Sequence, residues 1–210
     1  LNRSVLRIGF IPLCDAAPLI VAAEAGIFRA HGLKVELSRE MGWASIQEKL
    51  VRGELDFAHA LGPMPAATRP TIAGRPPGSL GLMALSRHGN GITLAESLRS
   101  EGVVDGVSLA DYLFQHSWEK PTALGVVAPY SSHARLFRDW LSQHDLKEGR
   151  HYHLVTIPPQ QFLRHLEAGT LLGACVGEPW NSLAVSRRLG FCVAVSPEIA
   201  PGHPEKVLAC

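Results

Sequence analysis

Long apolar runs are missing from this 210-residue sequence. The best candidate for a membrane span, residues 18–27, is interrupted by Glu24 and falls short of the roughly 20 residues that a spanning helix needs. Basic blocks are missing as well, since the formal net charge is +1 and the positive residues are dispersed. The sequence therefore predicts no transmembrane segment and no direct contact with nucleic acid.

Cysteine is scarce and scattered. The four cysteines, Cys14, Cys175, Cys192 and Cys210, show neither a CxxC spacing nor the density of a disulfide-stapled domain. We expect buried or unpaired thiols, which favours a reducing compartment. The first residue is Leu1 rather than Met, and no signal-peptide pattern precedes the first expected strand, so the N-terminus does not define the compartment.

Motifs of familiar catalytic and metal sites are absent too. Ten histidines invite a metal site, but there is no HExxH, and His151 and His153 lie two apart on an expected strand. We predict a loop at residues 203–205 rather than a ligand pair at helical spacing. The sequence has no GxSxG motif and no P-loop. These absences predict a protein that is not an enzyme and uses neither a metal nor a cofactor.

What the sequence does contain is a regular alternation of strand and helix patterns. Hydrophobic residues make up 46% and charged residues 19%, as in ordinary globular domains. Strands are expected at residues 7–12, 34–37, 56–61, 82–85, 123–127, 153–157, 171–176 and 191–195. Helices are expected at residues 18–32, 43–52, 131–141, 159–168 and 180–189. Strands separated by helices of this length predict parallel α/β sheets.

Glycine and proline mark the division of the chain. Residues 71–79 read as a loop, and the glycines of residues 88–91 break the strand that follows it. We place a crossover at residues 87–94, with lobe 1 formed by residues 1–87 and 198–210 and lobe 2 by residues 88–197. Helix N-termini facing a shared cleft would attract anions through their free N–H groups and their dipoles.

Four segments carry a family resemblance: "RIGFIPLCDAAPLIVAAEAGIFRAHGLKVELSREMGWASIQEKLVRGELDFAHALGPMP", "SSHARLFRDWL", "VGEPWNSLAV" and "GHPEKVLA". Together they resemble the nitrate/bicarbonate-binding proteins of ABC importers and the related cytoplasmic nitrate/nitrite sensors, in the same order along nearly the whole chain. The resemblance implies a type II periplasmic-binding-protein-like α/β fold with two lobes and a ligand cleft between them. Family members are longer, so further C-terminal helices are expected to be absent from this chain.

By this resemblance, four residues would bind the anion: Trp43, Asn90, His133 and Lys206. Nitrate has three acceptor oxygens and no donor, so its site needs donors. Lys206 would supply charge and most of the affinity, Trp43 an indole N–H and a flat wall, Asn90 an amide, and His133 a ring N–H at a helix start. Where the importers carry "NGQAI", this sequence has Gly89-Asn90-Gly91-Ile92. The amide therefore belongs to an asparagine, whose side chain is one methylene shorter than that of glutamine.

Each of these residues has a structural alternative. Trp43 could anchor a helix start in the core, His133 could cap a helix or lie on the surface, Lys206 could be a solvated lysine, and Asn90 could be a turn residue. Trp140 is predicted to be core. Two acidic residues follow expected strands and would repel an anion, so we predict that Asp15 and Glu178 position backbone or cap helices, with a Glu178–Lys206 pair as an alternative in the empty state.

The resemblance leaves three functional classes open. The first is an anion receptor whose partner is the membrane subunits of an importer, at the cell envelope, or an RNA-binding antiterminator in the cytoplasm. The second is an enzyme on the same fold, of the thiamine-precursor synthase or desulfinase type, with Cys14 as the candidate nucleophile. The third is the effector domain of a transcription regulator, which would need a helix-turn-helix before Leu1. The first, with nitrate or nitrite as the anion, is the predicted function.

Overall fold

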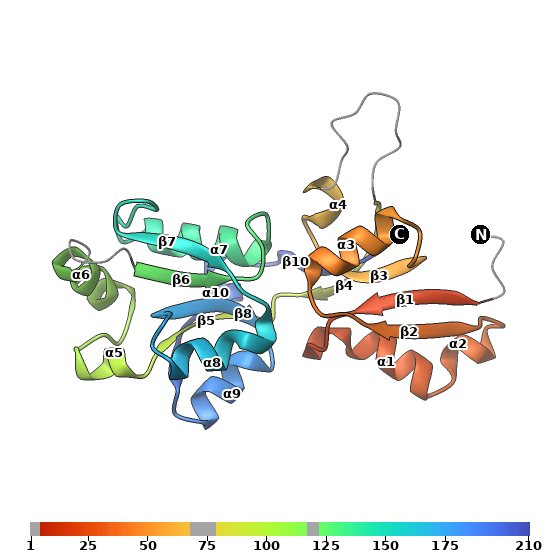
Figure 1. Ribbon diagram of the computed structural model, residues 1–210, viewed down its shortest axis with the longest axis horizontal. Coiled ribbons are helices and arrows are strands. Elements are labelled where there is room, and N and C mark those ends of the chain that lie inside the picture. Colours follow the sequence, from red (N-terminus) through yellow and green to blue (C-terminus); the bar gives the residue numbers. More distant parts are fainter. Residues whose placement is uncertain (1–4, 68–78, 117–121) are drawn as a thin grey trace. The chain divides into compact units, whose positions relative to one another are not determined.

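The computed structural model describes residues 5–67, 79–116 and 122–210. The chain divides into two compact units, which are called unit 1 (Leu1–Arg87 with Pro204–Cys210) and unit 2 (His88–His203) (Figure 1). Each unit holds its own five-stranded sheet. The predicted α/β class is therefore confirmed, whereas most of the loop predicted at residues 71–79 lies outside the described residues.

The sheet of unit 1 is completed by the end of the chain. Its strand order is β2 (Val35–Arg39), β1 (Leu6–Phe10), β3 (Phe57–Leu61), β10 (Pro204–Ala209) and β4 (Gly81–Arg87). β1 runs parallel to β2 and β3, whereas β10 pairs antiparallel with both β3 and β4. This insertion of β10 places the residues after Pro204 in the middle of the sheet rather than at its edge.

Short helices cover the sheet of unit 1: η1 (Cys14–Ala16), α1 (Ala17–Glu24), α2 (Ile27–Ala30), α3 (Trp43–Val51) and α4 (Met64–Ala67). In Figure 1, α1 and α2 lie on one face of the sheet and α3 on the other. The single helix predicted at residues 18–32 is divided in two by Gly26, whose φ of 71° is left-handed. Glycine adopts this conformation without steric cost, so the chain turns there between α1 and α2.

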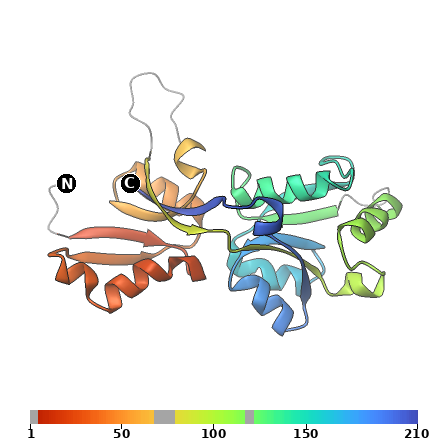
Figure 2. The same ribbon diagram turned by 180° about the vertical axis from the view of Figure 1, so that it is seen from behind.

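Unit 2 repeats the mixed architecture. Its strand order is β7 (Tyr152–Thr156), β6 (Thr122–Val126), β8 (Gly173–Gly177), β5 (Asn90–Ala95) and β9 (Gly190–Val195). β6 is parallel to β7 and β8, and β5 is antiparallel to β8 and β9. The helices are α5 (Ser97–Ser100), α6 (Gly106–His116), α7 (Ser132–Ser142), η2 (Pro159–Gln161), α8 (Phe162–Glu167), α9 (Trp180–Ser186) and α10 (Ser196–Ile199). Figures 1 and 2 show α7 on one face of this sheet and α8 and α9 on the other.

The core of unit 2 forms around α7. Ser131 caps this helix, because its hydroxyl oxygen accepts a hydrogen bond of 3.1 Å from the backbone N–H of Ala134. The buried face of α7 includes Phe137 and Trp140, which join the main hydrophobic cluster. The assignment of Trp140 to the core is confirmed.

The break predicted at residues 88–91 is confirmed as a short turn, whereas three other predictions are wrong. His88 (φ 59°) and Gly89 (φ 89°) make this turn between β4 and β5, and β5 begins at once with Asn90. Residues 204–205 are strand rather than loop, since proline is tolerated at the first position of a strand. Residues 198–203, assigned to lobe 1, belong to unit 2, where α10 contacts β9 and α7. Both sheets are mixed rather than purely parallel, because β5 and β10 run antiparallel to their neighbours.

Two further expectations concern membrane-spanning helices and disulfide bonds. None of the helices in the described ranges has the length and apolar character that crossing a bilayer requires. The four cysteines, all of which are described, form no disulfide with one another.

Candidate functional site

Unit 1 contains a buried group of ionisable side chains at the side of its sheet where β1 and β3 end and β10 begins. We call Asp15, His59, Glu205 and Lys206 the Lys206 cluster. Asp15 lies in η1, shortly after β1, whereas His59 comes from β3 and the other two from β10. Pairing of β3 with β10 sets Lys206 opposite Leu61 and Leu208 opposite His59, so the strand register brings the cluster together.

Lys206 is fully buried between two carboxylates. Its Nζ lies 2.9 Å from Oδ2 of Asp15 and donates a hydrogen bond of 2.8 Å to Oε1 of Glu205. Burial alone would lower the pKa of Lys206, but the two carboxylates outweigh it and raise the pKa above its usual value. The ammonium therefore stays charged, and two of its three N–H donors are already engaged.

His59 is the second buried member of this cluster. Its Nε2 lies 2.9 Å from Oδ1 of Asp15, and its side chain is fully buried. Burial lowers the pKa of His59 and outweighs the opposing effect of Asp15, so the ring is neutral near pH 7. Burial also acts to raise the pKa of Asp15, but His59 and Lys206 more than offset it, and the net shift is downward.

Trp43 packs against this cluster from the first turn of α3. It is 3% exposed, its ring centroid lies 5.6 Å from that of His59, and Nζ of Lys206 lies 5.6 Å from the same ring. A cation at this distance from an indole face is electrostatically attracted to it. The indole N–H of Trp43 is buried and has no hydrogen-bond partner among the described residues, and the same holds for Nδ1 of His59.

The other two predicted ligand residues belong to unit 2. Asn90 starts β5, opposite Gly177 of β8, and is 3% exposed. Its backbone N–H contacts Oγ of Ser196 at 3.4 Å, but neither its side-chain nitrogen nor its oxygen has a partner in the described part of the chain. His133 is fully buried in the first turn of α7. The structure thus brings Trp43 and Lys206 together in unit 1 and places Asn90 and His133 in buried positions of unit 2.

A second buried asparagine shows what is unusual about Asn90. The side-chain oxygen of Asn181 accepts a 2.8 Å hydrogen bond from Thr93, and its nitrogen donates a 2.9 Å bond to the carbonyl of Val176. Buried amides are normally satisfied in this way, because an unmade hydrogen bond costs about 1–3 kcal/mol. Asn90 is as buried as Asn181 but lacks these bonds, so the cost of burying its amide is not offset by any described residue.

Glu178 and Asp15, which were both predicted to cap helices or position backbone, make different contacts. Glu178 acts as a cap, since its carboxylate accepts a 3.2 Å hydrogen bond from the backbone N–H of Ser182 in α9. Asp15 does not cap or position backbone as predicted; its carboxylate meets two cationic or ionisable side chains instead. Lys206 pairs with Asp15 and Glu205 of its own unit, and the alternative pairing of Lys206 with Glu178, which belongs to unit 2, stays a hypothesis.

Sequence reasoning missed two members of the cluster. His59 lies in the otherwise apolar strand "FAHAL", and a lone ionisable residue in a buried strand is a usable signal for a special environment. Glu205 was hidden by the wrong loop assignment at residues 203–205. Recognising "PEKVLA" as a strand would have shown two adjacent charged residues in a sheet interior, which requires that they be paired.

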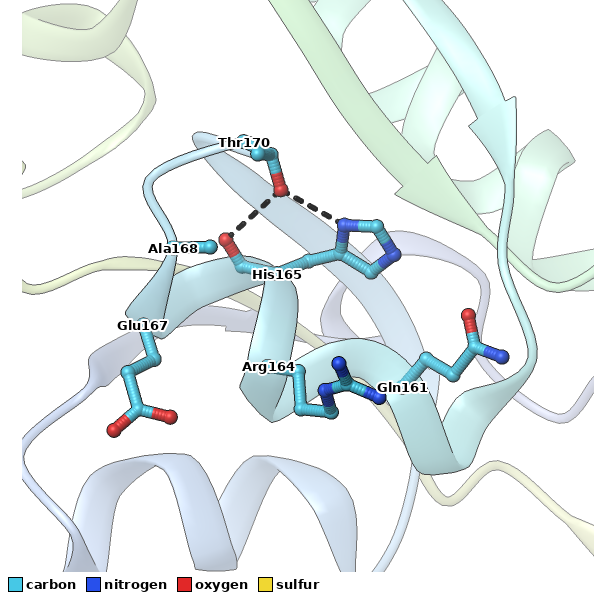
Figure 3. A pocket seen from close by; sticks show the side chains of 6 residues that line it. All are labelled: Gln161, Arg164, His165, Glu167, Ala168 and Thr170. Atoms are coloured by element: carbon cyan, nitrogen blue, oxygen red, sulfur yellow. Dashed lines mark hydrogen bonds between the residues drawn. The ribbon is translucent and has the colours of Figure 1, made fainter.

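A separate cavity of about 490 Å³ lies over α8 in unit 2, lined by Gln161, Arg164, His165, Glu167, Ala168 and Thr170 (Figure 3). The Thr170 hydroxyl lies between the ring and the carbonyl oxygen of His165, with its oxygen 2.8 Å from Nδ1 and 3.3 Å from that carbonyl. These side chains are mostly solvent-exposed, and none of them is a predicted ligand residue. We therefore assign the candidate site to the buried residues above.

Two α/β units with mixed five-stranded sheets, joined by chain segments that pass between them twice, define a periplasmic-binding-protein-like protein. The sequence profile of the NMT1-like family matches residues 1–210, and the chain belongs to this family. The predicted recognition and fold are thereby confirmed.

The proteins that this chain resembles are named for the import, transport or binding of nitrate or bicarbonate. The chain is 40% identical to the nitrate import ATP-binding protein NrtC of Synechocystis, over 99% of this chain and 31% of the relative. It is 39% identical to the bicarbonate transport ATP-binding protein CmpC of Synechococcus elongatus, over 99% and 32%. A crystal structure of the periplasmic nitrate-binding protein NrtA of Synechocystis matches with a TM-score of 0.90 at 27% identity, over 99% of this chain and 55% of that one. The chain thus spans about a third to about half of the length of these proteins.

Proposed function

We propose that this chain binds a small inorganic anion, nitrate or nitrite foremost and bicarbonate as the alternative, as the substrate-binding part of an ABC importer. Trp43, Asn90, His133 and Lys206 are the proposed ligand residues. In this function the chain captures and releases its ligand unchanged, with no catalytic step.

The observation that carries the proposal is a pair of buried donors without partners. The indole N–H of Trp43 and the side-chain amide of Asn90 are both withdrawn from water, and neither donates to any described residue. Nitrate presents acceptor oxygens only, so such donors match its chemistry. The remaining N–H of the buried Lys206 ammonium would add a charge-assisted bond, which is about twice as strong as a neutral one.

Only part of what the names of the relatives say is transferred to this chain in the proposal. NrtC and CmpC are named as ATP-binding proteins, yet the chain matches less than a third of each and contains no P-loop sequence. We therefore transfer anion binding and not ATP binding to this chain. Its partner in the proposal is the membrane-embedded part of an importer; the antiterminator of the sensor hypothesis finds no counterpart among these relatives.

An enzyme on the same fold remains the second hypothesis, with Cys14 as its nucleophile. Cys14 opens η1 beside Asp15 and is exposed, so it is accessible to a substrate. Mass spectrometry after incubation with candidate substrates tests this hypothesis. A covalent adduct on Cys14 would favour the enzyme, whereas an unmodified protein whose Cys14→Ser variant still binds nitrate would favour the receptor.

Thermal unfolding with a panel of anions tests the proposal. A ligand that binds only the folded state stabilises it by about 2.7 kcal/mol at a concentration of 100 times Kd. We expect nitrate to raise Tm, nitrite or bicarbonate to follow, and an alkanesulfonate at equal ionic strength to have no effect. A shift with the alkanesulfonate alone would contradict the proposed ligand class.

A further inference from the structure

The Lys206 cluster is poorly suited to a monoanion as it stands. Two carboxylates, from Asp15 and Glu205, contact a single ammonium, so the cluster has a net formal charge of −1 while His59 is neutral. All four side chains are at least 86% buried, since Asp15 is the most accessible of them at 14%. Water therefore screens this charge weakly. An anion held beside Lys206 and Trp43 would need a further positive charge nearby.

The orientation of His59 determines where that charge can appear. Nε2 lies 2.9 Å from a carboxylate oxygen of Asp15, a close contact that does not meet hydrogen-bond geometry. The neutral ring carries its proton on Nε2, because the other tautomer would set a lone pair against that carboxylate. Nδ1 then presents a lone pair, and it is buried without a partner among the described residues. A lone pair repels nitrate oxygens, whereas an N–H at the same atom would attract them.

We propose that capture of a donor-free monoanion such as nitrate takes up one proton from solvent, and that Nδ1 of His59 is the atom that receives it. The inference rests on the proposed function. The proton bonds to the lone pair of Nδ1, no other bond changes, and the imidazolium then donates from Nε2 to Asp15 and from Nδ1 toward the anion. His59 is thus a positioning and charge-balancing residue of the anion site.

The groups that face His59 support this assignment. Asp15 from η1 favours the imidazolium, and Glu205 from β10 does so at longer range, whereas Lys206 from β10 opposes it. Trp43 from α3 contributes an aromatic ring 5.6 Å away and no titrating group. The neighbours of His59 along β3, Ala58 and Ala60, are uncharged. An arriving anion adds a second negative charge to that of Asp15, which favours the charged form of the ring.

In the free protein the ring is neutral near pH 7, since burial holds the pKa of His59 below 6.5. Nitrate binding at that pH therefore requires uptake from solvent rather than use of a proton already present. Ligand and proton affinities are reciprocally linked, so nitrate should bind more tightly as the pH falls. In the pH range where a full proton is taken up, the Kd for nitrate changes by about tenfold per pH unit.

The test is calorimetric titration of the protein with nitrate at pH 6.0, 7.0 and 8.0, each in two buffers of different ionisation enthalpy. We expect uptake of close to one proton at pH 7.0 and a Kd that rises with pH. His59→Gln should bind with a Kd independent of pH and no proton uptake. His151→Gln is the matched control, because His151 is also buried and burial lowers its pKa, but it lies in unit 2 outside the site; it should behave as the wild type.

The outcomes separate this inference from the proposed function. Nitrate binding without proton uptake, or uptake that persists in His59→Gln, would overturn the inference alone. No nitrate binding at any pH would overturn both. Should His59→Gln fail to fold, the ring nitrogen chemical shifts of His59 in the wild-type protein decide: the inference requires a neutral Nε2–H form without nitrate and an imidazolium with it.

Discussion

Replacing Lys206 by methionine should destabilise unit 1 far more than removal of an ordinary ion pair. Methionine keeps most of the side-chain volume but removes the countercharge of two buried carboxylates, those of Asp15 and Glu205. Removing one partner of a buried ion pair typically costs 3–5 kcal/mol, because the remaining charge stays buried without compensation. For a chain of this length, that corresponds to a decrease in Tm of about 6–20 °C.

Urea unfolding of wild type and Lys206→Met, followed by tryptophan fluorescence, measures this loss. The deficit should shrink as the pH falls toward the range in which carboxylates bind protons, because protonation removes the uncompensated charge. Adding Glu205→Gln to Lys206→Met should restore part of the stability for the same reason. Lys49→Met is the matched control: Nζ of Lys49 lies 2.9 Å from Glu40, but this lysine is 38% exposed and Ser38 and Ser45 also donate to Glu40.

The reasoning would be refuted if Lys206→Met unfolded within 1 kcal/mol of wild type or if its deficit were no larger than that of Lys49→Met. The result also bears on ligand binding. Affinity measurements on Lys206 variants have to be made where the variant is shown to be folded, since loss of the fold and loss of the anion contact would otherwise look alike.

Three further predictions concern other buried residues. Burial lowers the pKa of His59 in the folded state, so the unfolded chain binds more protons at a pH between that lowered value and 6.5. The free energy of unfolding should therefore fall as the pH drops below 6.5. In urea titrations, His59→Gln should reduce this dependence on pH to the part that His151 contributes. Trp43→Phe should weaken nitrate binding about fivefold to tenfold through loss of one N–H donor, whereas Trp43→Ala should also lower Tm because it leaves a cavity. Asn90→Ala should leave Tm within error and weaken nitrate binding about fivefold, while Asn181→Ala, which breaks two buried hydrogen bonds, should lower Tm without a comparable specific effect on Kd. An Asn90→Ala variant that is as destabilised as Asn181→Ala would argue against a ligand role for Asn90.

Local patterns were sufficient to predict most helices and strands. The strands at residues 56–61 and 153–157 and the helix that starts at Trp43 were predicted within one or two residues. The two strands contain short runs of apolar residues, and the helix buries one face through Trp43, Ile46 and Leu50. The local pattern did not contain the direction of the strands, because the antiparallel insertion of β5 and β10 depends on partners that are distant along the chain, such as Gly177 for Asn90 and Leu61 for Lys206.

The site shows the same division between local and long-range information. The resemblance singled out Lys206 and Trp43, and the structure finds them together in unit 1. It did not show that Asp15, Glu205 and His59 surround the lysine, because those contacts arise from the pairing of β3 with β10 and from the position of η1. The sequence therefore predicted a free cation for the anion, whereas the structure contains a cation that is already paired.

Calorimetric titration with nitrate at pH 6.0 tests the central claim most directly. We expect saturable binding of one nitrate per chain, competition by nitrite or bicarbonate, and no heat of binding with an alkanesulfonate. Trp43→Phe and Asn90→Ala, both folded, should each bind more weakly than wild type. Unaltered nitrate affinity in both variants, or no saturable binding of any of these small anions to the folded wild-type protein, would contradict the account.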